Sequence, residues 1–224
     1  AAVPGANPGA PTLTGVVAGD GDAEVSFTAG DANGATITNY QFSVDGGTSW
    51  TALNPVDTSS PVTVTGLANG TAYTVQLRAV TTVGTGAAST ASSSFTPTGA
   101  PGAPTGLAVS SSDGDAVLTW TAPSATGGAD ITDYIVQYRA TTTTTWSTFS
   151  DGTGTSVTAT VTGLDSAIDY AFRVAAVNSE GTGDYSGEVV LVAVSSASAA
   201  QSTISAADSV IDDSGSTTVT VQLV

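Results

Sequence analysis

The sequence predicts an all-β fold with two tandem β-sandwiches, and three observations support this prediction. The run VTGL occurs at residues 64–67 and again at 161–164, each time with the same spacing to a following tyrosine, Tyr73 or Tyr170. After each tyrosine, apolar and polar residues alternate, as they do in a strand with one buried face. Short β-rich runs are separated by Gly, Asp and Asn turns, and no stretch has the spacing of an amphipathic helix. An internal repeat of this kind indicates a chain of similar modules.

The strands are expected in the same order in both modules. Asp45-Gly46-Gly47 is a hairpin turn signal that closes the third strand of the first module. Alternation and turn residues place the clearest strands at residues 24–28, 37–44, 117–121 and 131–138.

Proline-rich stretches and a Ser/Ala run divide the chain into parts. The phrase Pro-Gly-Ala-Pro-Thr occurs at residues 8–12 and again at 101–105, where proline removes ladder donors and stiffens the entry to the first strand. We expect a linker at residues 1–11, a first sandwich at 12–98, a second at 99–195, and an incomplete element at 196–224.

The repeated residues resemble the fibronectin type III family in its bacterial form. The second copy carries Trp120 on its second strand, Tyr134 on its third, and Asn178 with Gly181 after its sixth. The first copy has Thr81 in place of the asparagine. The resemblance implies immunoglobulin-like sandwiches, with Trp120 or its counterpart filling the space between the sheets.

Tyr73 and Tyr170 match the tyrosine corner of that family. Each is expected to bury its ring while its hydroxyl bonds a nearby backbone carbonyl. The resemblance implies a structural core made of Phe27, Tyr40, Leu67, Tyr73, Trp120, Tyr134, Leu164 and Tyr170.

The charge balance excludes several classes of function. The chain has 19 acidic and 3 basic residues, a formal net charge of −16, and no lysine, histidine, cysteine or methionine. Such a surface repels phosphates, so we expect no binding to nucleic acid. No apolar run approaches the length of a membrane span, so membrane insertion is not expected either. Without cysteine, histidine or lysine there is no thiol or amine nucleophile, no imidazole base and no zinc site of the usual ligand types, so carboxylate pairs and hydroxyls remain. No acidic pair is flanked by the aromatic residues that a glycoside-hydrolysing cleft needs, so we expect no catalysis.

The segment after residue 195 does not fit two domains. Val219, Val221 and Leu223 alternate with polar residues, and the segment resembles the opening two strands of an invasin-like bacterial immunoglobulin domain. Two interpretations remain open. The segment is a β-hairpin from a truncated third domain, or it is a donor strand whose apolar residues complete a sheet on a neighbouring subunit and so mediate assembly.

Two sets of residues are candidate binding sites. Asp208, Asp212 and Asp213 offer oxygen ligands for calcium at the join to this segment, although a solvated turn explains them more simply. Trp50 and Trp146 lie at matching places on expected edge strands. Their rings are candidates for stacking on surface glycans, although packing over the sheet edge is the simpler interpretation.

These features indicate a secreted, non-catalytic structural protein. The leading hypothesis is a subunit or stalk of an extracellular bacterial surface assembly, such as a filament, surface layer or large adhesin, which associates with itself or with neighbouring domains through β-strands. One alternative is a spacer or carbohydrate-binding region of a secreted polysaccharide-degrading enzyme. Another is a decoration or tail module of a phage virion.

Overall fold

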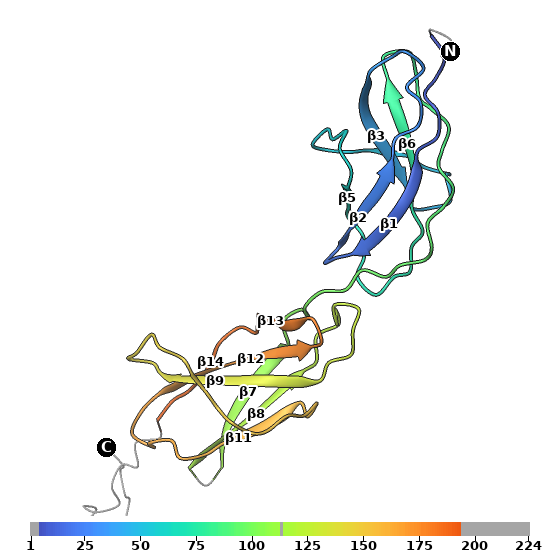
Figure 1. Ribbon diagram of the computed structural model, residues 1–224. Coiled ribbons are helices and arrows are strands. Elements are labelled where there is room, and N and C mark those ends of the chain that lie inside the picture. The colour runs from blue at the N-terminus through green and yellow to red at the C-terminus, as the bar shows by residue number, and fades with distance from the viewer. Residues whose placement is uncertain (1–4, 113, 194–224) are drawn as a thin grey trace, which may run out of the picture. The chain divides into compact units, whose positions relative to one another are not determined.

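The computed structural model of the chain describes residues 5–112 and 114–193 (Figure 1). All regular elements in this part of the chain are β-strands, so no helix there is long and apolar enough to cross a membrane. The predicted all-β fold with two sandwiches is therefore confirmed. The segment at residues 196–224, with its predicted hairpin or donor strand, lies outside the described residues.

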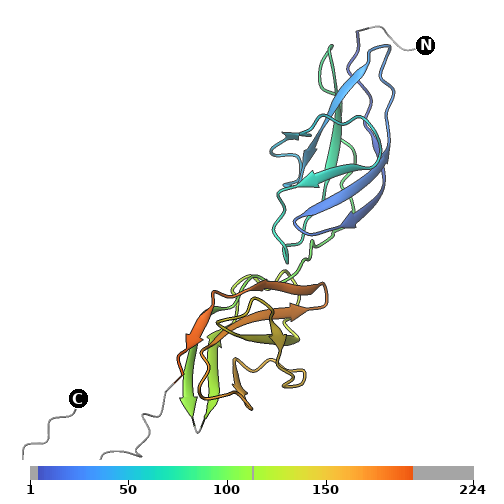
Figure 2. The same cartoon turned by 90° about the vertical axis from the view of Figure 1, so that its left-hand side faces the viewer.

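The first sandwich consists of two three-stranded sheets that face each other (Figures 1 and 2). All pairings are antiparallel, and one strand order is β1-β2-β5 and the other β4-β3-β6. The bounds are β1 Thr12–Ala18, β2 Asp22–Thr28, β5 Val62–Thr65, β3 Ile37–Ser43, β4 Thr51–Ala52 and β6 Gln76–Thr81.

The second sandwich repeats this plan and extends one sheet. Its smaller sheet has the order β11-β8-β7, and its larger sheet has the order β10-β9-β12-β13 with β14 also paired to β12. The bounds are β7 Thr105–Ser112, β8 Asp115–Thr121, β11 Thr158–Val161, β9 Asp133–Ala140, β10 Ser147–Thr148, β12 Tyr170–Asn178, β13 Gly181–Tyr185 and β14 Val189–Leu191.

An aromatic pair lies at the centre of each core. Phe27 packs edge-on against Tyr40 with ring centroids 4.6 Å apart, and Trp120 packs against Tyr134 in the same way at 5.3 Å. All four side chains are buried, as is Leu67, whereas Leu164 is only partly buried against the second core. Alternation along each strand therefore directs one face inward, where these large rings fill the space between the sheets.

The tyrosine-corner residues, Tyr73 and Tyr170, are partly buried and pack against the edges of the two cores. Their hydroxyl groups accept hydrogen bonds from the backbone N–H of Ala68, at 3.1 Å, and of Asp165, at 3.4 Å. The predicted partner of each hydroxyl, a backbone carbonyl, is therefore wrong. The bonds differ because the loop turns its N–H group, not its carbonyl oxygen, toward each ring.

Strand β6 begins at Gln76, later than the alternation after Tyr73 suggests. The reason is that Gln76 lies opposite Ser43, the last residue of β3. Serine hydroxyls also accept main-chain hydrogen bonds in this region. The N–H groups of Val75 and Leu77 donate to the side chains of Ser92 and Ser89, each at 3.0 Å, and the two serine N–H groups donate back to the main chain. In the second sandwich Ser186 bonds the N–H of Val174 at 3.1 Å in the same manner.

Asn178 fixes the loop after β12. Its side-chain oxygen accepts bonds from the N–H groups of Glu180 and Gly181, and its amide nitrogen donates to the carbonyls of Gly99, at 2.8 Å, and Thr126, at 2.9 Å. A buried amide with all four bonds made holds these segments in one arrangement. Thr81 is shorter and bonds only within its own loop, to Val83 and Gly84.

We expect the substitution Tyr40→Phe to leave the protein as stable or to stabilise it. The hydroxyl of Tyr40 is buried and has no hydrogen-bond partner among the described residues, and burial raises the pKa of this group. Removing an unpaired buried hydroxyl relieves a desolvation cost of about 1–3 kcal/mol. Urea denaturation followed by circular dichroism measures the change.

The matched control is Tyr73→Phe, which removes a hydroxyl that does accept a hydrogen bond. It is expected to lower the free energy of unfolding by about 1 kcal/mol. Equal losses in both variants would contradict the assignment of an unpaired hydroxyl to Tyr40.

Candidate functional site

In the first sandwich an arginine and a tryptophan stack on the outer face of the sheet β4-β3-β6. Arg78 on β6 lies directly opposite Gln41 on β3 and donates through Nε to Gln41 Oε1 at 2.7 Å. The Arg78 Cζ atom lies 4.2 Å from the centroid of the ring of Trp50, the residue that precedes β4 in the sequence. Trp50 in turn donates from its indole nitrogen to the Gly47 carbonyl at 3.0 Å, which fixes the ring.

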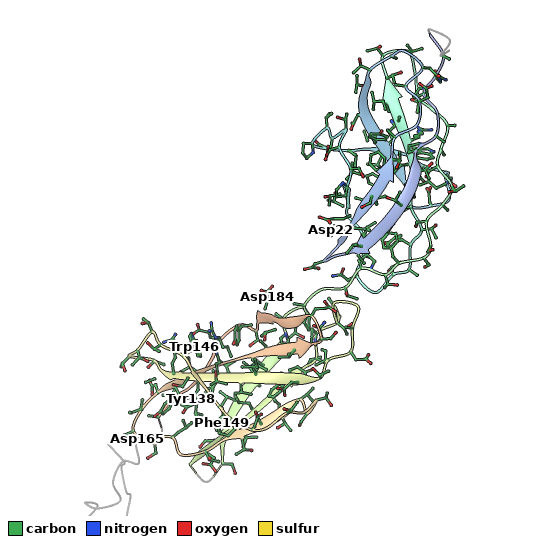
Figure 3. The ribbon with its side chains drawn as sticks, viewed as in Figure 1. Asp22, Tyr138, Trp146, Phe149, Asp165 and Asp184 are labelled. Carbon is green, nitrogen blue, oxygen red and sulfur yellow. The ribbon has the colours of Figure 1, made fainter. Side chains whose placement is uncertain are left out.

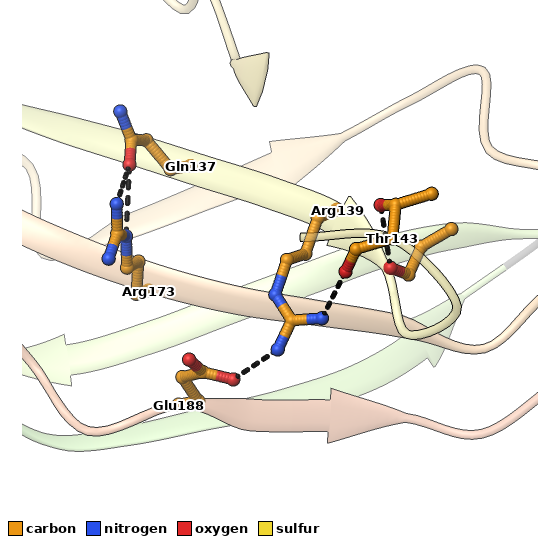
Figure 4. Close-up of polar contacts among 6 residues, drawn as sticks. Gln137, Arg139, Thr143, Arg173 and Glu188 are labelled. Atoms are coloured by element: carbon orange, nitrogen blue, oxygen red, sulfur yellow. Dashed lines mark hydrogen bonds and ion pairs between the residues drawn. The ribbon is translucent and has the colours of Figure 1, made fainter. Parts of the chain in front are cut away.

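The second sandwich carries a longer stack on the same face. Arg173 on β12 donates through two nitrogens to Gln137 on β9, at 2.9 and 2.7 Å (Figure 4). Its Cζ atom lies 4.2 Å from the centroid of Trp146 and 4.1 Å from that of Tyr185. Figure 3 shows the Trp146 side chain beside β9 and β12. A second cation, Arg139, lies 4.9 Å from the centroid of Trp146.

Arg139 is held from two sides (Figure 4). It donates to the Thr143 carbonyl at 2.7 Å and forms an ion pair with Glu188 at 2.9 Å. The Glu188 side chain is 47% exposed, so water screens this pair and it adds little stability.

The two stacks occupy different positions relative to the core tyrosines. Gln41 follows Tyr40 directly, whereas Gln137 lies two residues further along from Tyr134. The arginine and the tryptophan are displaced by the same two residues as the glutamine, so all three occupy a different position along the sheet in the second domain. Because side chains alternate between faces, a shift of two residues keeps the trio on the outer face.

All three cations of the chain therefore take part in aromatic stacks. Each guanidinium is planar and covers a ring, which suits arginine and not lysine. Trp50 and Trp146, the candidates for glycan contact, are partly buried, and a cation covers a ring face of each. The stacks brace the short strands β4 and β10, and the covered ring faces are not open to a sugar.

The turn after β3 contains an acidic group with unusual surroundings. The carboxylate of Asp45 accepts bonds from the hydroxyl and N–H groups of Ser49 and from the hydroxyl of Ser43. These bonds, with the Ser49 hydroxyl as the largest cause, hold the pKa of Asp45 well below its usual range. Asp57 has a similar, smaller arrangement in which bonds from Ser59 lower its pKa. Both carboxylates support turns.

The described residues include no group of three or more Asp, Glu, His or Cys side chains placed to hold a metal ion. The candidate calcium ligands Asp208, Asp212 and Asp213 lie outside the described residues, as do Val219, Val221 and Leu223. Within residues 5–112 and 114–193, the polar clusters consist of hydrogen-bonded turns and stacks.

Comparison with known proteins identifies the family. The model of the fibronectin type III domain matches residues 7–95 and again residues 102–192. The chain belongs to the fibronectin type III family. Domains of this family are typically non-catalytic modules of extracellular proteins, and the match covers both sandwiches.

Solved structures with similar folds include two multidomain chains. The FN1–FN3 domains of chicken CNTN1 are 23% identical over 82% of this chain, with a TM-score of 0.48. Titin kinase with its flanking domains is 35% identical over 43% of this chain, with a TM-score of 0.39. This chain spans 65% and 18% of the lengths of those two chains.

The arginine stacks of both fibronectin type III domains were not predicted from the sequence. The spacing from the corner tyrosine to the arginine differs between copies, from Tyr73 to Arg78 and from Tyr170 to Arg173, so the repeat does not reveal them. A usable signal was that a chain with only 3 basic residues places each of them within a β-strand.

Replacing Arg173 by lysine is expected to destabilise the second domain by about 1–2 kcal/mol, because lysine keeps the charge but loses the paired bonds to Gln137 and the planar stack. Urea denaturation in a Trp50→Phe background measures this, since the remaining tryptophans lie in the second domain. The control Glu188→Gln should change stability by less than about 0.5 kcal/mol. Equal effects of the two substitutions would refute a structural role for the stack.

The Asp45 carboxyl is expected to titrate far below the pH at which an aspartate in the unfolded chain titrates, about 3.9. Because the folded-state pKa is the lower one, the hydrogen bonds stabilise the fold above that pH. This stabilisation is lost progressively as the pH falls from about 4 toward the folded-state pKa. Carboxyl-carbon NMR shifts recorded against pH, in the folded chain and in the urea-unfolded chain, measure the pKa of Asp45 in each state. A titration midpoint shared by both states would contradict the hydrogen-bond geometry.

Proposed function

We propose that this chain is a non-catalytic structural subunit or stalk of an extracellular bacterial surface assembly, such as a filament, surface layer or large adhesin. The observation that carries the proposal is that the described residues place their polar groups in structural roles. The arginines brace sheets, and acidic groups such as Asp45 and Asp57 bond their own turns. Two domains with separate buried cores are suited to act as spacers.

The mechanism is mechanical. Each domain unfolds as a cooperative unit, so it keeps its length under load. Copies of the chain associate through β-strand contacts, and the excess of acidic residues keeps single copies in solution until those contacts form. In this proposal the protein is secreted and acts at the cell surface.

A carbohydrate-binding role has less support, because arginines cover ring faces of Trp50 and Trp146. Binding of a soluble polysaccharide that is lost on changing either tryptophan to alanine would favour that role instead.

The test is the solution mass of the full chain beside a version that ends at Ser195, measured by light scattering after size exclusion. The proposal expects the full chain to form concentration-dependent oligomers and the shorter version to remain a monomer. The shorter version retains both buried cores, so a difference reports on residues 196–224. Two monomers across the whole concentration range would count against a self-assembling subunit.

A further inference from the structure

One edge of the first domain is open. A groove of about 450 Å³ runs between residues 13–16 of β1 and residues 90–95. Its apolar residues Leu13, Val16 and Phe95 are only partly buried, although they pack against the core. None of its lining residues is charged.

The stretch of the second domain that corresponds to residues 90–95 contains a regular strand. Strand β14 pairs with β12 and also lies against β7, so Val189 and Leu191 cover the same core as Leu107 and Val109. In the first domain, residues 88–95 form no regular strand. Ser89 and Ser92 fasten this stretch to the region of β6, and the groove opens on its other side.

Other sheet edges of the first domain are poor places for a further strand. Strand β4 has 2 residues and adjoins the stacked Trp50 and Arg78, and β5 has 4 residues. Short edges and charged neighbours are standard means of preventing strand addition. By contrast, β1 has 7 residues, and Val17 on it is 67% exposed.

The chain contains a segment with matching properties. Residues 216–224 carry no charge, and in their sequence Val219, Val221 and Leu223 alternate with polar residues. Their number exceeds the 7 residues of β1, so the segment can run the length of that edge. An uncharged strand and an uncharged groove can meet without electrostatic repulsion.

We propose that residues 216–224 of a second copy of this chain add as a strand to the free edge of β1, with Val219, Val221 and Leu223 facing Leu13, Val16 and Phe95. The choice of a second copy rests on the proposed function. Main-chain bonds to β1 supply affinity, and the apolar face fixes which residues point inward.

The proposal fixes which face each tail residue occupies. Gly15 pairs with Ser26, between the inward-facing Val25 and Phe27, so position 15 lies on the outer face of the sheet. The polar residues of the tail, Thr218, Thr220 and Gln222, must then lie on that same outer face. An added Cβ at Gly15 would have its nearest contact at 4.0 Å, so a side chain is tolerated there.

Disulfide trapping tests this directly, because the chain has no cysteine. Gly15→Cys is combined, one at a time, with cysteine at 218, 220 or 222, and with cysteine at 219 or 221 as opposite-face controls. The expected result is a ladder of covalent oligomers from at least one of the first three pairs and none from the controls. A cross-linked monomer would place the tail on its own chain, and no cross-link from any pair would remove the tail from this edge; either overturns the proposal.

A charge placed in the groove provides the second test. Ala91 is exposed and lines the groove. It corresponds to Glu188 of the second domain, because each of these residues lies two positions after a serine whose hydroxyl bonds the neighbouring strand. Ala91→Glu should raise the midpoint concentration of self-association by roughly tenfold or more, since a carboxylate buried without a partner is costly. The control Ala108→Glu adds the same charge on β7 and should leave the midpoint unchanged.

The outcomes separate this proposal from the proposed function. If the full chain assembles but Ala91→Glu has no effect and no pair cross-links, the groove is not the contact, and the structural-subunit role stands. If the full chain stays monomeric at every concentration, the proposed function fails, and this contact between copies fails with it.

Discussion

The register of the central strand pair determines most of the structure of each domain. In the first domain β3 pairs with β6 so that Tyr40 lies opposite Ala79 and Phe42 opposite Leu77, all of them buried. The residues between them on the other face, Gln41 and Arg78, form the outer bond and carry the stack. A slip of one residue would send the arginine into the core and the aromatics into water. Core and outer stack are therefore two consequences of one pairing.

The edges of the domains follow from what borders that pair. On one side, Trp50 and Trp146 cover the central arginines and leave only the two-residue strands β4 and β10. On the other side the domains differ. The second has β14 beside β7, whereas the first has an irregular serine-rich stretch and an open groove. Two copies of one fold thus present different edges, because this stretch forms a regular strand, β14, in the second domain and an irregular one at residues 88–95 of the first.

The sequence was sufficient for the fold but not for the stacks. Alternation and turn residues located β2, β3, β8 and β9 to within a few residues, because the pattern of burial on a pleated strand is local. The contact between Arg78 and Trp50 joins two strands whose register depends on the whole sheet, and it moves by two residues between copies. Tyr73 and Tyr170 were assigned to tyrosine corners from the family resemblance, yet the partner of each hydroxyl depended on the orientation of a loop. Patterns within one strand were readable, and pairings between strands were not.

Charge constrains how this chain can meet another copy of itself. A contact between proteins often joins a basic patch to an acidic one, but here the only cations are three arginines held in stacks, with Arg139 already paired to Glu188. Removing an arginine from its stack to serve a contact would leave an aromatic ring uncovered and a strand edge unbraced. Ion pairs between copies are therefore unfavourable. Main-chain pairing and apolar contact do not depend on charge, so a neutral sheet edge is the most favourable meeting place on a surface of this kind.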